Sequence, residues 1–195
     1  MLRLPPRADG GIEVAVVLLL DDPVLNWIRR FQLGMENKYG ANPALPTTPH
    51  VTLKLGVPVQ DLEALAALVD RVAAESRPIQ LEAEGIDFFD DGIVFLAVSA
   101  GPELESLRQR VLDVLRREMG IVGYPLEEAG RFRYHVTLAR DLARGRFEEV
   151  RATLDRRTPA FRIHADRLAL LCWVRDSWVT CHRVELGPGA GTRGG

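Results

Sequence analysis

The same tetrapeptide, His-Val-Thr-Leu, occurs twice in this chain, at residues 50–53 and again at residues 135–138. Each copy begins a run of β-branched and apolar residues, a pattern that predicts a β-strand. Because side chains alternate between the two faces of a strand, each copy places His and Thr on one face and Val and Leu on the other. The Val and Leu face is expected to join a core, which leaves two imidazoles and two hydroxyls available for chemistry.

Two imidazoles and two hydroxyls suit the cleavage of a phosphodiester. The attacking oxygen must lose a proton and the leaving oxygen must gain one, and imidazole exchanges protons near neutral pH. We expect His50 and His135 to act as the general base and the general acid, each contributing roughly 10²–10⁴-fold in rate; which residue takes which role stays open. Thr52 and Thr137 would donate hydrogen bonds to non-bridging phosphate oxygens. No metal and no cofactor is expected.

Cationic side chains close to the two motifs are further candidates for contacts with a phosphate. Lys54 has the same strand parity as His50, and Arg133 has the same parity as His135 if the second strand extends that far back. Arg140 follows the second motif. By strict alternation it lies on the apolar face, so it reaches a phosphate only if the strand twists or ends there.

Apolar periodicity and turn signals predict an alternation of strands and helices along the chain. A loose lead-in is expected over residues 1–11, a single bilobal domain over 12–186 and a flexible tail over 187–195. Helices are expected from the Asp21-Asp22-Pro23 signal to about residue 38, and over residues 61–75, 104–119 and 146–154, with a loop over 120–130. Strands are expected over residues 14–20, 50–57, 79–89, 93–98, 134–140, 160–173 and 178–186.

The order of these elements indicates an internal duplication. The two motif histidines are 85 residues apart, and the same shift carries the helix over 61–75 onto the one near 146–160. It also carries the strand over 79–89 onto the region near 164–174. A duplication predicts two similar lobes around a pseudo-two-fold axis, each contributing one His-x-Thr strand to a shared cleft.

The paired motifs resemble those of the two-histidine (2H) phosphoesterase superfamily, and within it the bacterial RNA 2',3'-cyclic phosphodiesterases, also called 2'-5' RNA ligases. Residues 49–53 are similar to the first motif of that family, residues 135–140 to the second, and residues 85–98 to its central region. The resemblance implies an α/β fold of two antiparallel-sheet lobes with outer helices around a central cleft. It also implies metal-independent hydrolysis of cyclic phosphodiesters at RNA ends, and possible 2'-5' RNA ligase activity. His50 and His135 would be the acid and base, Thr52 and Thr137 the phosphate ligands, and Arg140 a further basic group.

Other functions fit the same residues. The two imidazoles and two hydroxyls could bind a terminal phosphate without catalysing a reaction, which would make the chain a binding module for RNA ends or nucleotides. The substrate could also be a related phosphodiester, such as ADP-ribose cyclic phosphate or a tRNA splicing intermediate. The expected partners are RNA 3' ends or small cyclic nucleotides, and a monomer is favoured because no apolar stripe is left over for a dimer.

Composition restricts the class of protein and the compartment that are expected. A net charge of −2 and a pI near 6.1 exclude a protein that coats nucleic acid without specificity. No apolar run approaches the roughly 20 residues that cross a bilayer, and no signal-peptide pattern occurs, so cytoplasm is expected.

Cys172 and Cys181 could face each other across a hairpin, but two free thiols are favoured in a reducing compartment. Structural roles are favoured for His164, His182, Trp173 and Trp178, and a solvated loop position for Asp141.

Overall fold

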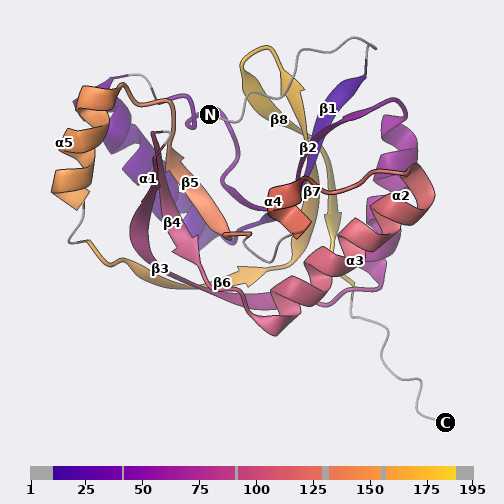
Figure 1. Ribbon diagram of the computed structural model, residues 1–195. Coiled ribbons are helices and arrows are strands. Elements are labelled where there is room, and N and C mark those ends of the chain that lie inside the picture. The colour runs from indigo at the N-terminus through magenta and orange to yellow at the C-terminus, as the bar shows by residue number, and fades with distance from the viewer. Residues whose placement is uncertain (1–10, 41, 91, 129–131, 155–156, 188–195) are drawn as a thin grey trace.

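The computed structural model describes residues 11–40, 42–90, 92–128, 132–154 and 157–187 (Figure 1). Apart from Gly11 and Gly187, the expected lead-in and tail lie outside these residues. The strands are β1 (Ile12–Leu19), β2 (His50–Val59), β3 (Ile79–Phe89), β4 (Ile93–Val98), β5 (His135–Ala139), β6 (Ala160–Ala165), β7 (Arg167–Val174) and β8 (Ser177–Glu185). The helices are α1 (Asp22–Tyr39), α2 (Leu62–Ala74), α3 (Pro102–Met119), α4 (Pro125–Glu128) and α5 (Arg144–Leu154).

The strands form two four-stranded antiparallel sheets, so the predicted fold of two antiparallel-sheet lobes with outer helices is confirmed. The first sheet has the order β2-β1-β7-β8 and the second the order β5-β4-β3-β6. The two motif strands, β2 and β5, therefore occupy equivalent edges. The two halves also exchange strands, since the first half gives β3 to the second sheet and the second half gives β7 and β8 to the first.

The helices are exchanged between the halves in the same way. Helix α1 connects two strands of the first sheet but packs against β5 of the second, and α3 connects two strands of the second sheet but packs against β2 of the first. Both helices have 18 residues and begin with a proline in the first turn, where the missing N–H costs no hydrogen bond. Both end at a glycine with positive φ, Gly40 at 87° and Gly120 at 64°.

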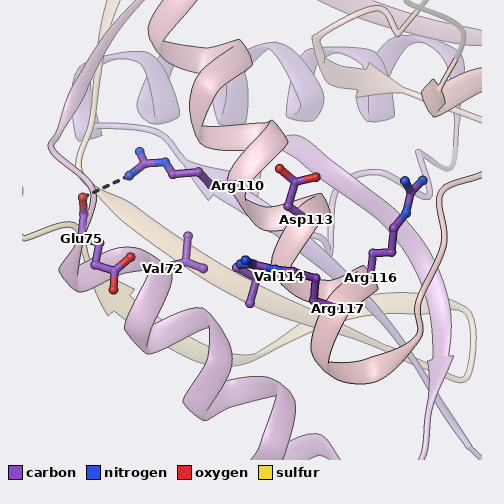
Figure 2. A pocket seen from close by; sticks show the side chains of 7 residues that line it. All are labelled: Val72, Glu75, Arg110, Asp113, Val114, Arg116 and Arg117. Carbon is purple, nitrogen blue, oxygen red and sulfur yellow. Dashed lines mark hydrogen bonds between the residues drawn. The ribbon is translucent and has the colours of Figure 1, made fainter.

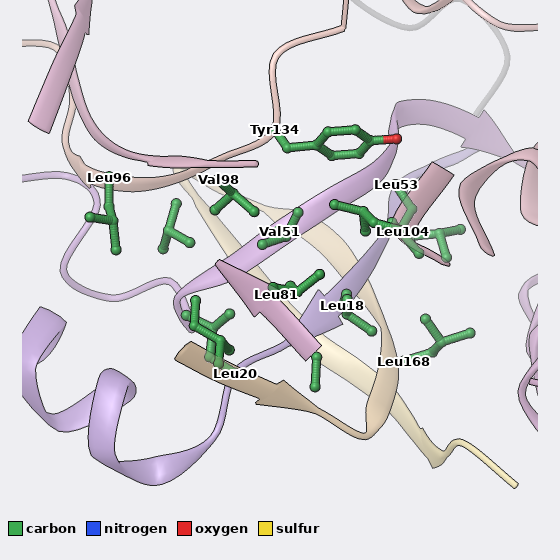
Figure 3. Close-up of a cluster of buried hydrophobic side chains, with 14 of the residues drawn as sticks. Leu18, Leu20, Val51, Leu53, Leu81, Leu96, Val98, Leu104, Tyr134 and Leu168 are labelled. Atoms are coloured by element: carbon green, nitrogen blue, oxygen red, sulfur yellow. The ribbon is translucent and has the colours of Figure 1, made fainter. Parts of the chain in front are cut away.

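A single large core joins the two sheets to the helices. Each sheet turns one face toward the helices, and the alternate residues of its strands are buried there, Leu18 and Val51 in the first sheet and Leu96 and Val136 in the second. Figure 3 shows part of this cluster, with side chains from both sheets and from α3. We call the opposite face of each sheet its inner face. None of the described helices is long and apolar enough to cross a membrane.

The C-terminal strands differ from the sequence prediction. The single strand expected over residues 160–173 is two strands, because the chain leaves the second sheet after Ala165 and enters the first at Arg167. Asp166 lies at the crossing, where its carbonyl accepts a hydrogen bond from Leu186 N at 2.7 Å. Apolar patterning cannot reveal such a change of sheet, because it shows which residues of β6 and β7 are buried but not which strand each of them pairs with.

Two further expectations are corrected. The loop over residues 120–130 contains the short helix α4. The expectation of free thiols is wrong, since Cys172 and Cys181 form a disulfide with their Cα atoms 6.2 Å apart. In the β7–β8 pair Cys172 lies opposite Val179, and the register irregularity between Leu170 and Leu171 falls at residue 181, between Thr180 and His182.

The free edges of both motif strands are covered by helices rather than by further strands. On β5, the carbonyl of Thr137 accepts from Gln32 Nε2 at 3.3 Å and the carbonyl of Leu138 accepts from Asn42 Nδ2 at 3.0 Å. On β2, the carbonyl of Leu53 accepts from Arg108 Nε at 3.1 Å. Leu53 and Leu138 are equivalent under the 85-residue shift, so the duplicated strands are held in the same way by side chains from the opposite half.

A buried ion pair adds to this support on β2. Lys54 Nζ lies 2.8 Å from Glu127 Oε2, and the two side chains are 1% and 0% exposed. The Glu127 carboxylate also accepts from the amides of Leu55 and Tyr124, at 2.9 and 2.8 Å, and its carbonyl accepts from Arg108. Burial lowers the pKa of Lys54, and the hydrogen bond and charge of Glu127 counteract that effect. The pair therefore fastens α4 to the strand that carries His50.

Removing Glu127 should destabilise the protein strongly, because it leaves the Lys54 ammonium buried without its partner. We expect Glu127→Ala to lower the free energy of unfolding by about 3–5 kcal/mol, measured by urea denaturation. Glu127→Gln, which keeps an acceptor for the two amides, should cost less. The control is Glu118→Ala, which breaks the exposed Arg71–Glu118 pair and should cost at most about 1 kcal/mol. Equal effects of Glu127→Ala and Glu118→Ala would contradict this account of α4.

Candidate active site

The two motif histidines are held by the same local hydrogen bond. His50 Nδ1 lies 2.7 Å from the carbonyl oxygen of Thr48, and His135 Nδ1 lies 2.8 Å from the carbonyl oxygen of Arg133. A carbonyl oxygen can only accept, so each Nδ1 carries the proton and donates it. This bond to the residue two positions earlier fixes the tautomer and orientation of each ring. Both rings are half-buried, and in this tautomer Nε2 is the ring nitrogen that can take up a proton.

The fold brings the two histidines close to each other although they belong to different sheets. Strands β2 and β5 lie against each other. Burial lowers the pKa of His50 to about 4, and the charge of His135 acts in the same direction, while the Thr48 carbonyl opposes both. His50 is therefore neutral at pH 7, as a general base must be. The convergence of the two motifs on one phosphate stays a prediction, which the neighbouring strands and the effect of the His135 charge on His50 support.

The two threonines lie on the inner faces with the histidines. Thr52 pairs with Val17 and His50 with Leu19 across β1, and both partners belong to the cluster on the inner face of the first sheet. On the second sheet, Thr137 pairs with Phe95 across β4. Both threonines are half-buried. The structure thus places each His and Thr of a motif on one face, as strand alternation predicts.

Lys54 does not share that face, so the predicted parity is wrong. A register shift in the β1–β2 pair places Thr52 opposite Val17 but Lys54 opposite Val16, which belongs to the core on the helix side. The irregularity turns Lys54 away from the inner face, where it meets Glu127 instead. A one-residue slip of this kind reverses every side chain that follows it, and sequence parity cannot detect it.

The two candidate arginines near β5 have different surroundings. Strand β5 ends at Ala139 and Asp141 has φ of 56°. Arg140 therefore lies beyond the strand, and the alternation of side chains between the two faces does not determine its direction. Its Nη1 lies 2.6 Å from Asp141 Oδ2, its Nη2 donates to the carbonyl of Asp176 at 3.2 Å, and its guanidinium lies 5.7 Å from the Trp173 ring centroid. Arg140 therefore reaches from the second sheet to the β7–β8 turn of the first, and Asp141 is its ion partner rather than a solvated carboxylate.

Arg133 lies beside His135 but is engaged with groups that sequence reasoning did not single out. Its guanidinium pairs with the Asp87 carboxylate and lies 5.4 and 5.2 Å from the ring centroids of Phe89 and Phe95. The same two rings contact the His135 ring, at centroid distances of 5.1 and 5.2 Å. The alternation of Asp87 and Phe89 near the end of β3 was the available signal, but it identifies a site only once β5 is known to lie nearby.

The remaining aromatic and histidine candidates have structural surroundings. Trp173 and Trp178 pack edge to face across the β7–β8 hairpin, with centroids 5.2 Å apart. His164 Nδ1 lies 2.8 Å from Gln80 Nε2 on neighbouring strands, and His182 Nε2 lies 2.6 Å from Asp70 Oδ1 of α2. Within the described ranges, no group of three or more His, Cys, Asp or Glu side chains is arranged to hold a metal ion.

A groove lies between α2 and α3 (Figure 2). Its lining consists of side chains from these two helices and their ends, where Arg110 donates to the carbonyl of Glu75 at 3.1 Å. No residue of either His-x-Thr motif lines this groove. The candidate site is therefore at the junction of β2 and β5 and not in the groove.

Comparison with known proteins gives one family. A family model described as the 2'-5' RNA ligase superfamily matches residues 20–177, which include both motifs. No curated protein matches the chain.

Solved structures share the fold at low sequence identity. The protein TT0787 of Thermus thermophilus is 18% identical, with a TM-score of 0.66 over 92% of this chain and 100% of its own. E. coli LigT complexed with NADP⁺ is 16% identical, with a TM-score of 0.60 over 92% of this chain and 99% of its own. E. coli LigT complexed with 3'-AMP is 15% identical, with a TM-score of 0.57 over 91% and 99%.

The environment of His50 makes its titration a direct test of the site. We expect NMR to show a pKa of about 4 with the proton on Nδ1 at neutral pH, because burial disfavours the imidazolium. His135→Gln should raise this pKa, since it removes a repelling charge. The folded protein should also lose stability as the pH falls from about 6.5 toward 4, where only the unfolded imidazole binds a proton. A His50 that titrates near 6.5 in the folded protein would contradict the arrangement.

Proposed function

Since the chain belongs to the 2'-5' RNA ligase superfamily, we propose that it is a metal-independent phosphodiesterase that hydrolyses 2',3'-cyclic phosphate ends of RNA or of nucleotides. The observation that carries the proposal is the matched pair of imidazoles. Both donate Nδ1–H to a backbone carbonyl, which makes Nε2 the nitrogen that exchanges protons, and they belong to two strands that lie against each other. Such a pair can remove one proton and deliver another across one phosphorus atom.

We assign the general base to His50 and the general acid to His135. The lowered pKa keeps His50 neutral at pH 7, so its Nε2 can take the proton of the attacking water. The water oxygen bonds to phosphorus as the bond to one ribose oxygen breaks, and His135 gives its Nε2 proton to that leaving oxygen. The products are a phosphomonoester and a free ribose hydroxyl, and the two histidines have exchanged protonation states.

Thr52 and Thr137 are proposed to donate hydrogen bonds to the two non-bridging oxygens, where negative charge develops. Each threonine lies two residues after its histidine, on the same face of the strand as that histidine. Because the two strands belong to different sheets, the two hydroxyls would contact the phosphate from opposite sides. Arg140 is the proposed cationic group, since it reaches from the second sheet to the first. Lys54 has no part in this proposal, because Glu127 neutralises it inside the core.

The proposed partners are RNA 3' ends or small cyclic nucleotides. The fold relative LigT of E. coli has been solved with 3'-AMP and with NADP⁺, and both molecules contain a nucleotide phosphate. A nucleotide is therefore the first substrate class to test here.

Replacing either histidine should remove most of the activity. With adenosine 2',3'-cyclic phosphate, His50→Ala and His135→Ala should each lower kcat at least about 10²-fold, because each removes one proton transfer. His164→Ala is the matched control, an exposed imidazole on β6 that hydrogen-bonds to Gln80, and it should leave kcat near wild type. EDTA should not change the rate.

Smaller losses from both motif variants would exclude paired acid–base catalysis. Tight binding of the cyclic nucleotide with no product over hours would favour the binding-module alternative, and dependence on a divalent ion would reject the mechanism.

The pH dependence should identify His50 as the base. Protonation of His50 blocks proton removal from water, so the acidic limb of the kcat/KM profile should fall near pH 4, well below the value of an ordinary imidazole near 6.5. The measurement is kcat/KM from pH 3.5 to 9, with folding at each pH checked by circular dichroism. An acidic limb near pH 6.5 would assign the base to a different group.

A further inference from the structure

The two halves have the same residue types at the motif histidines and threonines but different residue types at the neighbouring positions. The 85-residue shift places Arg133 at the position of Thr48. The strand registers place Phe95, opposite Thr137, at the position of Val17, opposite Thr52. The inner face of the first sheet thus consists of aliphatic residues on which Trp178 packs, and that of the second has the aromatic ring of Phe95 beneath a guanidinium.

The aromatic side is a layered arrangement on one face of the second sheet. Phe95 is 0% exposed although it belongs to neither apolar cluster, because the Phe89 ring covers it at 4.3 Å and the Arg133 guanidinium at 5.2 Å. The Arg133 side chain itself is 52% exposed. One side of the guanidinium therefore rests on two rings while much of the group remains open to solvent.

Asp87 fixes the guanidinium in this position. Its carboxylate pairs with Arg133 Nη2 and its Oδ1 accepts from the amide of Phe88 at 2.7 Å. Burial alone would raise the pKa of Asp87, but the Phe88 amide and the charge of Arg133 hold it below its usual value. The carboxylate offsets the positive charge, so Arg133 offers a flat and largely neutralised surface rather than an isolated cation.

We propose that Arg133, supported by Phe89 and Phe95 and held by Asp87, is the stacking surface for the base of the nucleotide whose phosphate lies between His50 and His135. Bases stack on aromatic rings and on guanidinium planes because every base has a π-face. The contact between His135 and both phenyl rings places this surface beside the proposed acid. The assignment rests on the proposed function, and it replaces the phosphate contact expected for Arg133 from its strand parity.

The placement follows from the chemistry of the substrate. A cyclic nucleotide has a symmetric part, the phosphate with its two non-bridging oxygens, and an asymmetric part, the nucleoside. The repeated His and Thr residues match the symmetric part. The residues at which the halves differ match the asymmetric part, so the base is expected on the side of the second sheet.

Two substrates separate stacking from a phosphate contact: adenosine 2',3'-cyclic phosphate and glycerol 1,2-cyclic phosphate, which has no base. Arg133→Ala should raise the KM of the adenosine substrate relative to that of the glycerol substrate by roughly 5- to 100-fold, as expected for loss of one stacked base. Arg133→Lys keeps the charge but loses the plane, so it should lower the discrimination nearly as much. Phe89→Leu should act in the same direction.

A matched control is Arg151 of α5, which contacts Phe88 on the opposite face of β3. Arg151 lies 5.6 Å from the ring centroid of Phe88, which is the same kind of contact on the helix side of β3. Arg151→Ala should keep the wild-type ratio of the two KM values. Equal losses on both substrates after Arg133→Ala, or full rescue by Arg133→Lys, would overturn the proposal and return Arg133 to the phosphate.

Measurements of ligand binding can test the stacking surface independently of the proposed hydrolysis. If the wild-type protein hydrolyses neither substrate, the function fails but the stacking surface is still tested by calorimetric titration with 3'-AMP and with inorganic phosphate. Arg133→Ala should then weaken 3'-AMP binding about tenfold more than phosphate binding. Equal weakening of the two ligands, or no weakening of either, would overturn the stacking surface.

Discussion

Both motif strands lie at the edge of a sheet, and the position of each histidine depends on how that edge is closed. An edge strand leaves backbone groups unpaired, and buried backbone groups need partners. Here the partners are side chains from the opposite half: Gln32 of α1 and Asn42 of the segment after it on β5, and Arg108 of α3 on β2. Because these bonds cross between the halves, neither motif strand can move without disturbing the other half. The mutual position of the two imidazoles is a consequence of this exchange.

The buried Lys54–Glu127 pair has the same function at shorter range. An ion pair in an apolar interior costs desolvation free energy and is weak evidence for stability, whereas a hydrogen-bonded pair specifies one arrangement because every alternative leaves a buried charge unpaired. Lys54 is two residues beyond Thr52, and Glu127 binds the Leu55 amide as well as the ammonium. The pair thus holds α4, in the connection from α3 to β5, against the strand that carries His50.

The sequence was sufficient to predict the longer helices and the first strands, because these depend on local periodicity and capping. The helix that ends at Gly40 and the strand pair around residues 79–98 lie where composition places them. Interactions between distant elements could not be predicted. The face of Lys54 depends on a register shift against β1, the break at Asp166 on a change of sheet, and the role of Phe89 on the proximity of β5. Each of these is decided by a partner strand that local patterning does not identify.

The two inner faces also differ in how they are covered. A Cβ atom on Gly56 would come within 2.5 Å of Trp178 Cη2, so the absence of a side chain at residue 56 lets the indole lie across the first sheet from β8 to β2. Trp178 packs there on the small residues Ala15 and Val17 and closes that face. On the second sheet the equivalent layer ends in Arg133, which stays half exposed. A duplicated fold would offer a substrate two equivalent approaches. The indole occupies one of them, so the asymmetry on which the proposed stacking surface depends originates in part from a single glycine opposite a single tryptophan.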